Sequence, residues 1–156
     1  MTSFFFDSEK VIAATDKAER RNLSKAGAFI RRSARSSIRK TKKTSLPGQP
    51  PRSHVGLLRD RLFFEYDISA RAVVAGPEKA KPANVPQLLE YGGSLVIREV
   101  YSERAQKWYR QNSRFRNQLN WPHRTRTVQF EARPYMFPAY KANESKFPEL
   151  WRDSIK

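Results

Sequence analysis

Acidic, histidine and arginine side chains are the residue types here from which a reaction at a phosphate could be built. Glu90 or Glu99 could act as a general base, His54 or His123 as a general acid, and arginines could hold the phosphate, as in a small basic ribonuclease. The histidines stand on proline-flanked loops and, without cysteine or clustered carboxylates, lack metal-ligand spacing. No P-loop, GxSxG or HExxH motif is present. We therefore expect no catalytic residues, no metal and no cofactor, and keep the ribonuclease as an alternative hypothesis.

The composition predicts one folded domain with a polyanionic or acidic partner. The chain has 156 residues, with 31 lysines and arginines against 15 acids, and a net charge of +16. This length suits a single core, so we expect one domain over residues 1–156. The absence of cysteine excludes disulfides, thiolate zinc sites and a thiol nucleophile. No apolar run reaches the ~20 residues of a membrane span, so we expect an intracellular protein with no membrane partner.

The cations fall in two blocks without acids, from Arg20 to Arg59 and from Arg104 to Thr127. The first block includes the far end of a long helical pattern. Its cations could be solvated side chains that complement the helix dipole, or they could form an arm that faces DNA or an acidic partner. Both interpretations remain open for this set: Arg31, Arg32, Arg35, Arg39, Lys40, Lys42 and Lys43.

The second block lies in an insertion over residues 102–124 that mixes arginines with aromatic rings. Such mixtures are typical of sites for single-stranded nucleic acid, where bases stack on rings and cations bind phosphate. Alternatively, the rings pack on their own domain or on a neighbouring subunit, where tryptophan and arginine are also enriched. We favour packing, and the candidate contact residues are Trp108, Arg110, Arg114, Arg116 and Trp121.

The elements that must position these residues form an α+β pattern. Periodicity predicts a long N-terminal helix and a C-terminal helix packed on an antiparallel sheet of about four strands, with a short helix before the third strand. Asp7 is the expected N-cap of the long helix. The expected segments are a long helix over 7–40, a proline-rich arm over 41–55, a hairpin, short helix and third strand over 56–101, the insertion over 102–124, and the last strand, a hinge and the C-terminal helix over 125–156.

The hinge is the stretch ARPYMFPAY, from Ala132 to Tyr140. Its first proline extends Arg133, and its second suits the first turn of a helix. Glu90, in LLEYGG, stands near the end of the short helix, where the dipole disfavours a carboxylate unless it has a cation partner. We therefore predict that Glu90 and Arg133 form a buried or half-buried ion pair, a structural clamp between the short helix and the hinge.

Several of these features occur in an order that resembles a known family. They are a basic amphipathic helix, a proline-rich loop leading into Gly56, Leu58 and Arg59, a hairpin ending in VVAGP, then LLEYGG, and finally ARPYMFPAY with a closing helix. This order resembles the tail-completion or head–tail joining proteins of tailed bacteriophages. The match covers about Val11 to Trp151, although the family pattern commonly has Thr where this chain has Gly93.

The resemblance implies a structural protein and not an enzyme. A family member would sit in a ring, typically a hexamer, at the head–tail junction of the virion, after synthesis in the host cytoplasm. Its partners would be copies of itself, a tail terminator or tail tube protein, and head connector or adaptor proteins. Double-stranded DNA would pass through the lumen without sequence readout. The alternative function is a sequence-nonspecific nucleic-acid-binding protein that uses its basic and aromatic surface.

Overall fold

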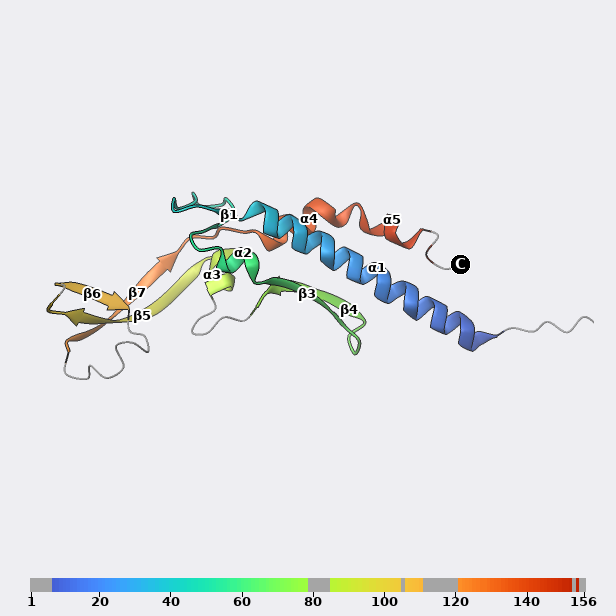
Figure 1. Cartoon of the computed structure of the whole chain (residues 1–156), viewed down its shortest axis with the longest axis horizontal. Helices are drawn as coiled ribbons and strands as arrows, with labels where there is room; N and C mark the ends of the chain where they lie inside the picture. The colour runs from blue at the N-terminus through green and yellow to red at the C-terminus, as the bar shows by residue number, and fades with distance from the viewer. Residues whose placement is uncertain (1–6, 79–84, 105, 111–120, 153, 155–156) are drawn as a thin grey trace, which may run out of the picture.

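A computed structural model describes residues 7–78, 85–104, 106–110, 121–152 and 154. The chain is an elongated mixture of helix and sheet built around one long helix, α1 (Ser8–Ser37) (Figure 1). The Asp7 side chain accepts the backbone N–H of Lys10 at 3.1 Å and caps α1, as predicted. The helix ends before the predicted Lys40, because Ile38 is extended and fully buried and Arg39–Lys40 form the short strand β1.

Two layers pack on opposite sides of α1. On one side lies an antiparallel hairpin of β3 (Leu62–Asp67) and β4 (Ala72–Pro77), which confirms the predicted hairpin. On the other side lie α4 (Met136–Glu144) and α5 (Phe147–Trp151) (Figure 1). The hairpin comes so close at Gly27 that an added Cβ would lie 2.5 Å from Val73 Cγ2.

Polar contacts hold both layers onto the helix. The Arg71 guanidinium binds the carboxylate of Glu19 and donates to Asp16 at 2.6 Å, so the hairpin turn is tied to α1. On the opposite side, Asn143 of α4 donates to the Ser33 hydroxyl at 2.7 Å. The long helix is therefore the middle layer of the body.

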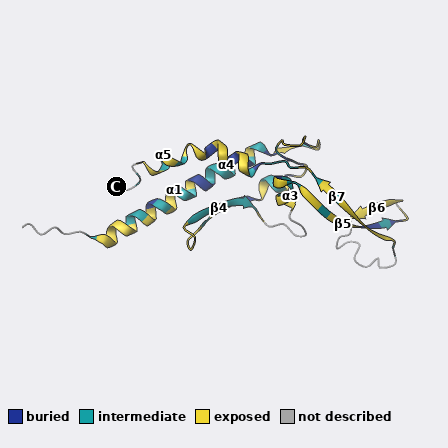
Figure 2. Cartoon of the chain, turned by 180° about the vertical axis from the view of Figure 1, so that it is seen from behind, coloured by how far each residue is buried: buried dark blue, intermediate teal, exposed yellow. Residues whose placement is uncertain are grey.

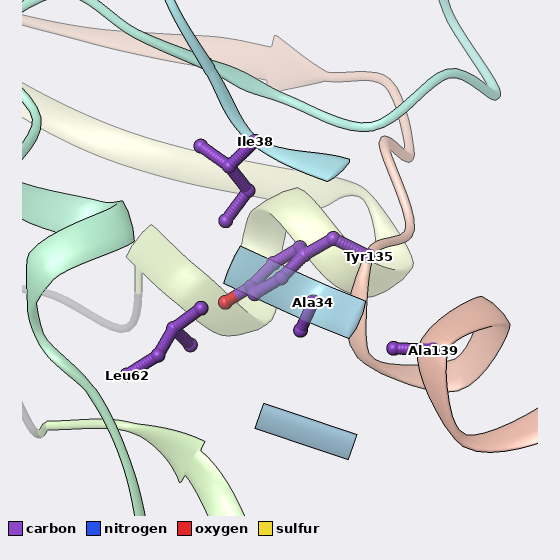
Figure 3. Close-up of a cluster of buried hydrophobic side chains, with 5 residues drawn as sticks. All are labelled: Ala34, Ile38, Leu62, Tyr135 and Ala139. Carbon is purple, nitrogen blue, oxygen red and sulfur yellow. The ribbon is translucent and has the colours of Figure 1, made fainter. Parts of the chain in front are cut away.

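The apolar core is small and lies where α1 ends. The Tyr135 ring is 1% exposed and fills the space between α1, the start of the hairpin and α4 (Figure 3). Burial raises the pKa of its hydroxyl, and the neighbouring Glu90 charge adds to this effect. The cluster consists of Ala34, Ile38, Leu62, Tyr135 and Ala139.

The strands do not form the single four-stranded sheet that the pattern predicted. They form three separate sheets: β1 (Arg39–Lys40) parallel to β2 (Arg52–Ser53), the β3–β4 hairpin, and an antiparallel sheet in the order β6–β5–β7. The last sheet, here called the arm, contains β5 (Gly93–Ser102), β6 (Lys107–Arg110) and β7 (His123–Phe130). Gly92 and Gly93, at φ of 75° and 130°, turn the chain between α3 (Val85–Tyr91) and the arm, which projects beyond the body (Figure 1).

Some local predictions were right and others were wrong. The predicted short helix forms and precedes the strand β5. The pattern missed the short helix α2 (Leu57–Asp60). The predicted C-terminal helix is broken into α4 and α5, with Pro148 in the first turn of α5 and Ser145 at the end of α4.

The proline-rich segment folds back onto the hinge. The Gly48 N–H donates to the Ala132 carbonyl at 2.8 Å, and the Thr41 N–H donates to the Ser53 carbonyl at 3.3 Å. Pro51 is buried. The chain itself therefore orders this segment. No helix within the described ranges is both long and apolar enough to cross a membrane.

Candidate partner-facing surfaces

The Glu90 carboxylate joins the short helix to the hinge through backbone hydrogen bonds. Glu90 is 8% exposed, and its carboxylate accepts the N–H groups of Tyr135 at 2.9 Å, Met136 at 3.0 Å and Phe137 at 2.8 Å. These groups begin α4, where backbone donors have no helical partner and the dipole favours a negative charge. Glu90 is therefore the cap of α4, supplied from a different helix.

The predicted ion pair between Glu90 and Arg133 does not form. The Arg133 guanidinium donates to the Ser45 carbonyl at 3.2 Å and to the Glu131 carbonyl at 3.4 Å, and its backbone N–H donates to the Leu89 carbonyl. The prediction placed Glu90 correctly as the joining residue but gave it the wrong partner. Three backbone donors at a helix start satisfy a buried carboxylate, so no cation is needed.

The seven candidate cations of the first block fall into two groups: one is bonded within the chain and the other faces solvent. Arg31 donates to the Leu62 carbonyl at 2.5 Å, and Arg35 contacts Asp60 at 3.3 Å. These two side chains fasten the end of α1 to the start of the hairpin. They are therefore positioned by their own chain and are less available to an outside anion.

The other five cations of the candidate set face solvent. Within the described part of the chain, none of their side chains has a hydrogen-bond or ion-pair partner. They follow one another along the last turns of α1, β1 and the loop after it. We call this set the basic platform: Arg32, Arg39, Lys40, Lys42 and Lys43.

The strand pairing concentrates positive charge on the platform. Arg39 of β1 lies opposite Arg52 of β2 in a parallel pair. Like charges directly opposite on neighbouring strands destabilise the pairing unless a counter-charge is present. The described acid nearest in sequence to Arg52 is Asp60, and it is engaged by Arg35. This arrangement favours an anionic partner over the platform.

A second charged cluster lies on one face of the arm. Glu99 contacts Arg124 at 2.7 Å and Arg126 at 3.1 Å, and Arg110 is its register partner on β6. The hydrogen bond from Arg124 holds the pKa of Glu99 below its usual range, and Arg126 adds to the effect. One carboxylate thus organises the arginines on this face.

Trp108 packs on its own chain. The Arg124 guanidinium lies 4.2 Å from the centre of the Trp108 ring, and the Tyr101 ring lies 5.2 Å away on the opposing strand. A ring already covered by a guanidinium offers less surface for a base to stack on. For Trp108 the packing interpretation is therefore supported.

The other predicted insertion residues are only partly placed. Trp121 is half-buried just before β7, whereas Arg114 and Arg116 lie outside the described residues. Sequence reasoning missed Arg126 and the organising role of Glu99. The register of β5 and β7 could have revealed both, because Glu99 and Arg124 are strand partners, as are Ile97 and Arg126.

The residues of the ribonuclease hypothesis are not assembled into a site. Glu90 is engaged by backbone donors and Glu99 by arginines, whereas His54 and His123 are exposed on separate segments. Among the described residues no group of three or more histidines, cysteines or acids could hold a metal ion. Comparison of the chain with protein-family models, with curated proteins and with solved structures found no match.

Proposed function

We propose that this chain is a structural subunit of a ring at the head–tail junction of a tailed phage, where it joins the tail to the head connector and lines the DNA passage. The ring is expected to contain several copies, with a hexamer as the working stoichiometry. The arm is the single observation that carries this proposal. Its three strands extend from the body, and no described helix covers either face (Figure 1).

A sheet that no described helix covers favours assembly. A small antiparallel sheet normally needs one face packed against something apolar to be stable. The arm carries half-buried Leu95, Ile97 and Val128 on one face, and most of its surface is exposed or half-buried (Figure 2). A neighbouring subunit in a ring would supply the missing cover.

The balance of exposed and buried apolar residues supports the same conclusion. In the described part of the chain, fifteen large apolar side chains are exposed, whereas four are fully buried: Ile38, Leu62, Val100 and Tyr135. Scattered exposed residues are normal in a monomer, but such a small core stabilises an isolated chain weakly. Contacts between subunits would add the missing burial.

Imaging of purified phage particles that carry this chain is the direct test. We expect a closed ring of density for the chain at the head–tail junction, and unjoined heads and tails when its gene is deleted. Absence of the chain from purified particles would contradict the proposal. So would heads and tails that still join when the chain is missing.

A sequence-nonspecific nucleic-acid-binding protein is the second candidate. The exposed, unpaired cations of the basic platform favour it. This function predicts that the isolated chain binds DNA or RNA at roughly micromolar affinity in ~0.15 M salt, without sequence preference and with a steep salt dependence. Weak binding under these conditions, together with a ring in particles, would leave the structural subunit as the function.

A further inference from the structure

The outer face of the β3–β4 hairpin is acidic and partly apolar. Alternation along the strands turns Leu62, Phe64 and Tyr66 towards α1 and leaves the intervening residues outside. Strand partners share a face, so Glu65 and Val74 lie together, as do Asp67 and Ala72. Phe63 is 52% exposed and Val74 is 63% exposed. We call Phe63, Glu65, Asp67 and Val74 the hairpin face.

The charges on the strand positions of the hairpin face are negative, and the Arg31 guanidinium lies 6.0 Å from the centre of the Phe63 ring at the edge of this face. Glu65 has no hydrogen-bond or ion-pair partner among the described residues. Asp67 accepts the N–H groups of Ser69 and Ala70, and these turn contacts, led by the Ser69 hydroxyl, keep its pKa low. None of the strand positions on this face carries a lysine or an arginine.

The arm has a face of the opposite character. Register pairs place Leu95 with Val128, Ile97 with Arg126, and Glu99 with both Arg124 and Arg110 on one side of the sheet. Three arginines against one glutamate leave this side positive. We call Leu95, Ile97, Arg110, Arg124, Arg126 and Val128 the arm face.

We infer that the hairpin face of one copy docks on the arm face of the next copy. The inference rests on the proposed ring and names the surfaces that would close it. The two faces match in charge, and each places apolar side chains beside its charged ones, as protein interfaces do. They belong to separate parts of the elongated molecule (Figure 1), so a head-to-tail contact uses one of each per copy and can close into a ring.

A second copy fits the arm face better than DNA does. The apolar stripe of Leu95, Ile97 and Val128 offers nothing to a phosphate backbone, and Arg124 and Arg126 are already engaged by Glu99. The basic platform, with cations that have no partner among the described residues, is the better surface for DNA.

Charge reversal on the full-length chain tests the contact. Self-association would be measured by sedimentation velocity over a wide concentration range. Glu65→Arg should weaken it by roughly tenfold or more, since an arginine would then meet the arm arginines. Glu131→Arg makes the same charge change at an exposed site beside the hinge and should leave association unchanged.

The specific test is whether a second charge reversal, on the arm face, restores self-association. Adding Arg126→Glu to Glu65→Arg should recover association, and an equimolar mixture of the two single variants should recover it through alternating copies. Because Arg126 contacts Glu99, Arg110→Glu serves as a second arm variant, with circular dichroism to confirm folding.

Several outcomes would overturn the inference. These are unchanged association in Glu65→Arg, a wild-type chain that stays monomeric at every concentration, or arm variants that lose DNA binding but keep self-association. The last result would assign the arm face to DNA. Imaging of particles decides separately on the proposed function, because a ring could close through other surfaces.

Discussion

The Glu90 carboxylate accepts the backbone N–H of Tyr135 at 2.9 Å, and this contact links the arm to the body. Glu90 lies in the last turn of α3, the short helix that precedes β5, while Tyr135 is the fully buried ring of the core. The orientation of the arm is therefore coupled to the packing of α4 against α1. Any assembly that uses the arm depends on this joint.

Glu90→Gln should destabilise the fold by about 2 to 3 kcal/mol, because the amide of glutamine faces backbone donors that need an acceptor. Arg133→Gln is the matched comparison and should cost about 1 kcal/mol or less, since its guanidinium makes two long bonds to carbonyls. Urea denaturation of both variants measures the difference. Equal losses of unfolding free energy in the two variants would instead indicate the ion pair that the sequence predicted.

Gly27→Ala should destabilise the fold although alanine is the better helix former. The new Cβ would lie 2.5 Å from Val73 Cγ2 and 2.9 Å from Phe64 Cδ2, and overpacking of this kind costs about 1 to 3 kcal/mol. The helix propensity of alanine offsets roughly 1 kcal/mol of that cost. Thermal unfolding gives the measurement.

Val73→Ala provides the test of mechanism for Gly27→Ala. Removal of the valine methyl groups opens the space that the new Cβ needs. The double variant should therefore be more stable than the sum of the single changes predicts. If the two stability changes were strictly additive, the close approach of hairpin and helix would not be the cause of the destabilisation by Gly27→Ala.

Arg124→Gln should raise the pKa of Glu99 towards its usual range, because the hydrogen bond from Arg124 is the main cause of its depression. Carboxyl carbon NMR across an acid titration measures the shift, and Arg126→Gln should produce a smaller one. A depressed pKa means that the pair adds stability at neutral pH. That contribution is lost as the pH falls below the ordinary glutamate range and through the lowered pKa.

Neutralising the basic platform should reduce the salt dependence of DNA binding. A variant with glutamine at Arg39, Lys40, Lys42 and Lys43 should lower the slope of log affinity against log salt by about 0.9 for each phosphate that the protein no longer neutralises. Lys10, Lys17, Arg20 and Lys25, which are exposed along α1 before the platform, are the matched set. Fluorescence anisotropy with duplexes of unrelated sequence measures both variants, and an equal reduction in slope would show that only net charge matters.

Local patterns in the sequence sufficed where neighbouring residues decide the structure. The spacing of Ala18, Ala26 and Ala34 marks the buried stripe of α1, and alternation from Leu62 to Asp67 marks the hairpin. Two-residue and four-residue periods arise from backbone geometry alone, so they can be read without knowledge of the fold. The short helix α3 and the glycine that follows it, Gly92, were predictable in the same way, because neighbouring residues decide them.

Contacts between distant segments were decided only by the tertiary structure. A carboxylate can cap a helix start 45 residues away or pair with an arginine, and both would look alike in the sequence around Glu90. In the same way, alternation identifies strands but not their grouping, so three separate sheets replaced the expected single sheet. The sequence by itself determined the long helix, the hairpin, the short helix and the position of the charges along the chain. Packing of α1 between hairpin and α4 decided which charged groups are bonded within the chain and which face solvent, because burying a charge is costly unless it is paired and hydrogen-bonded.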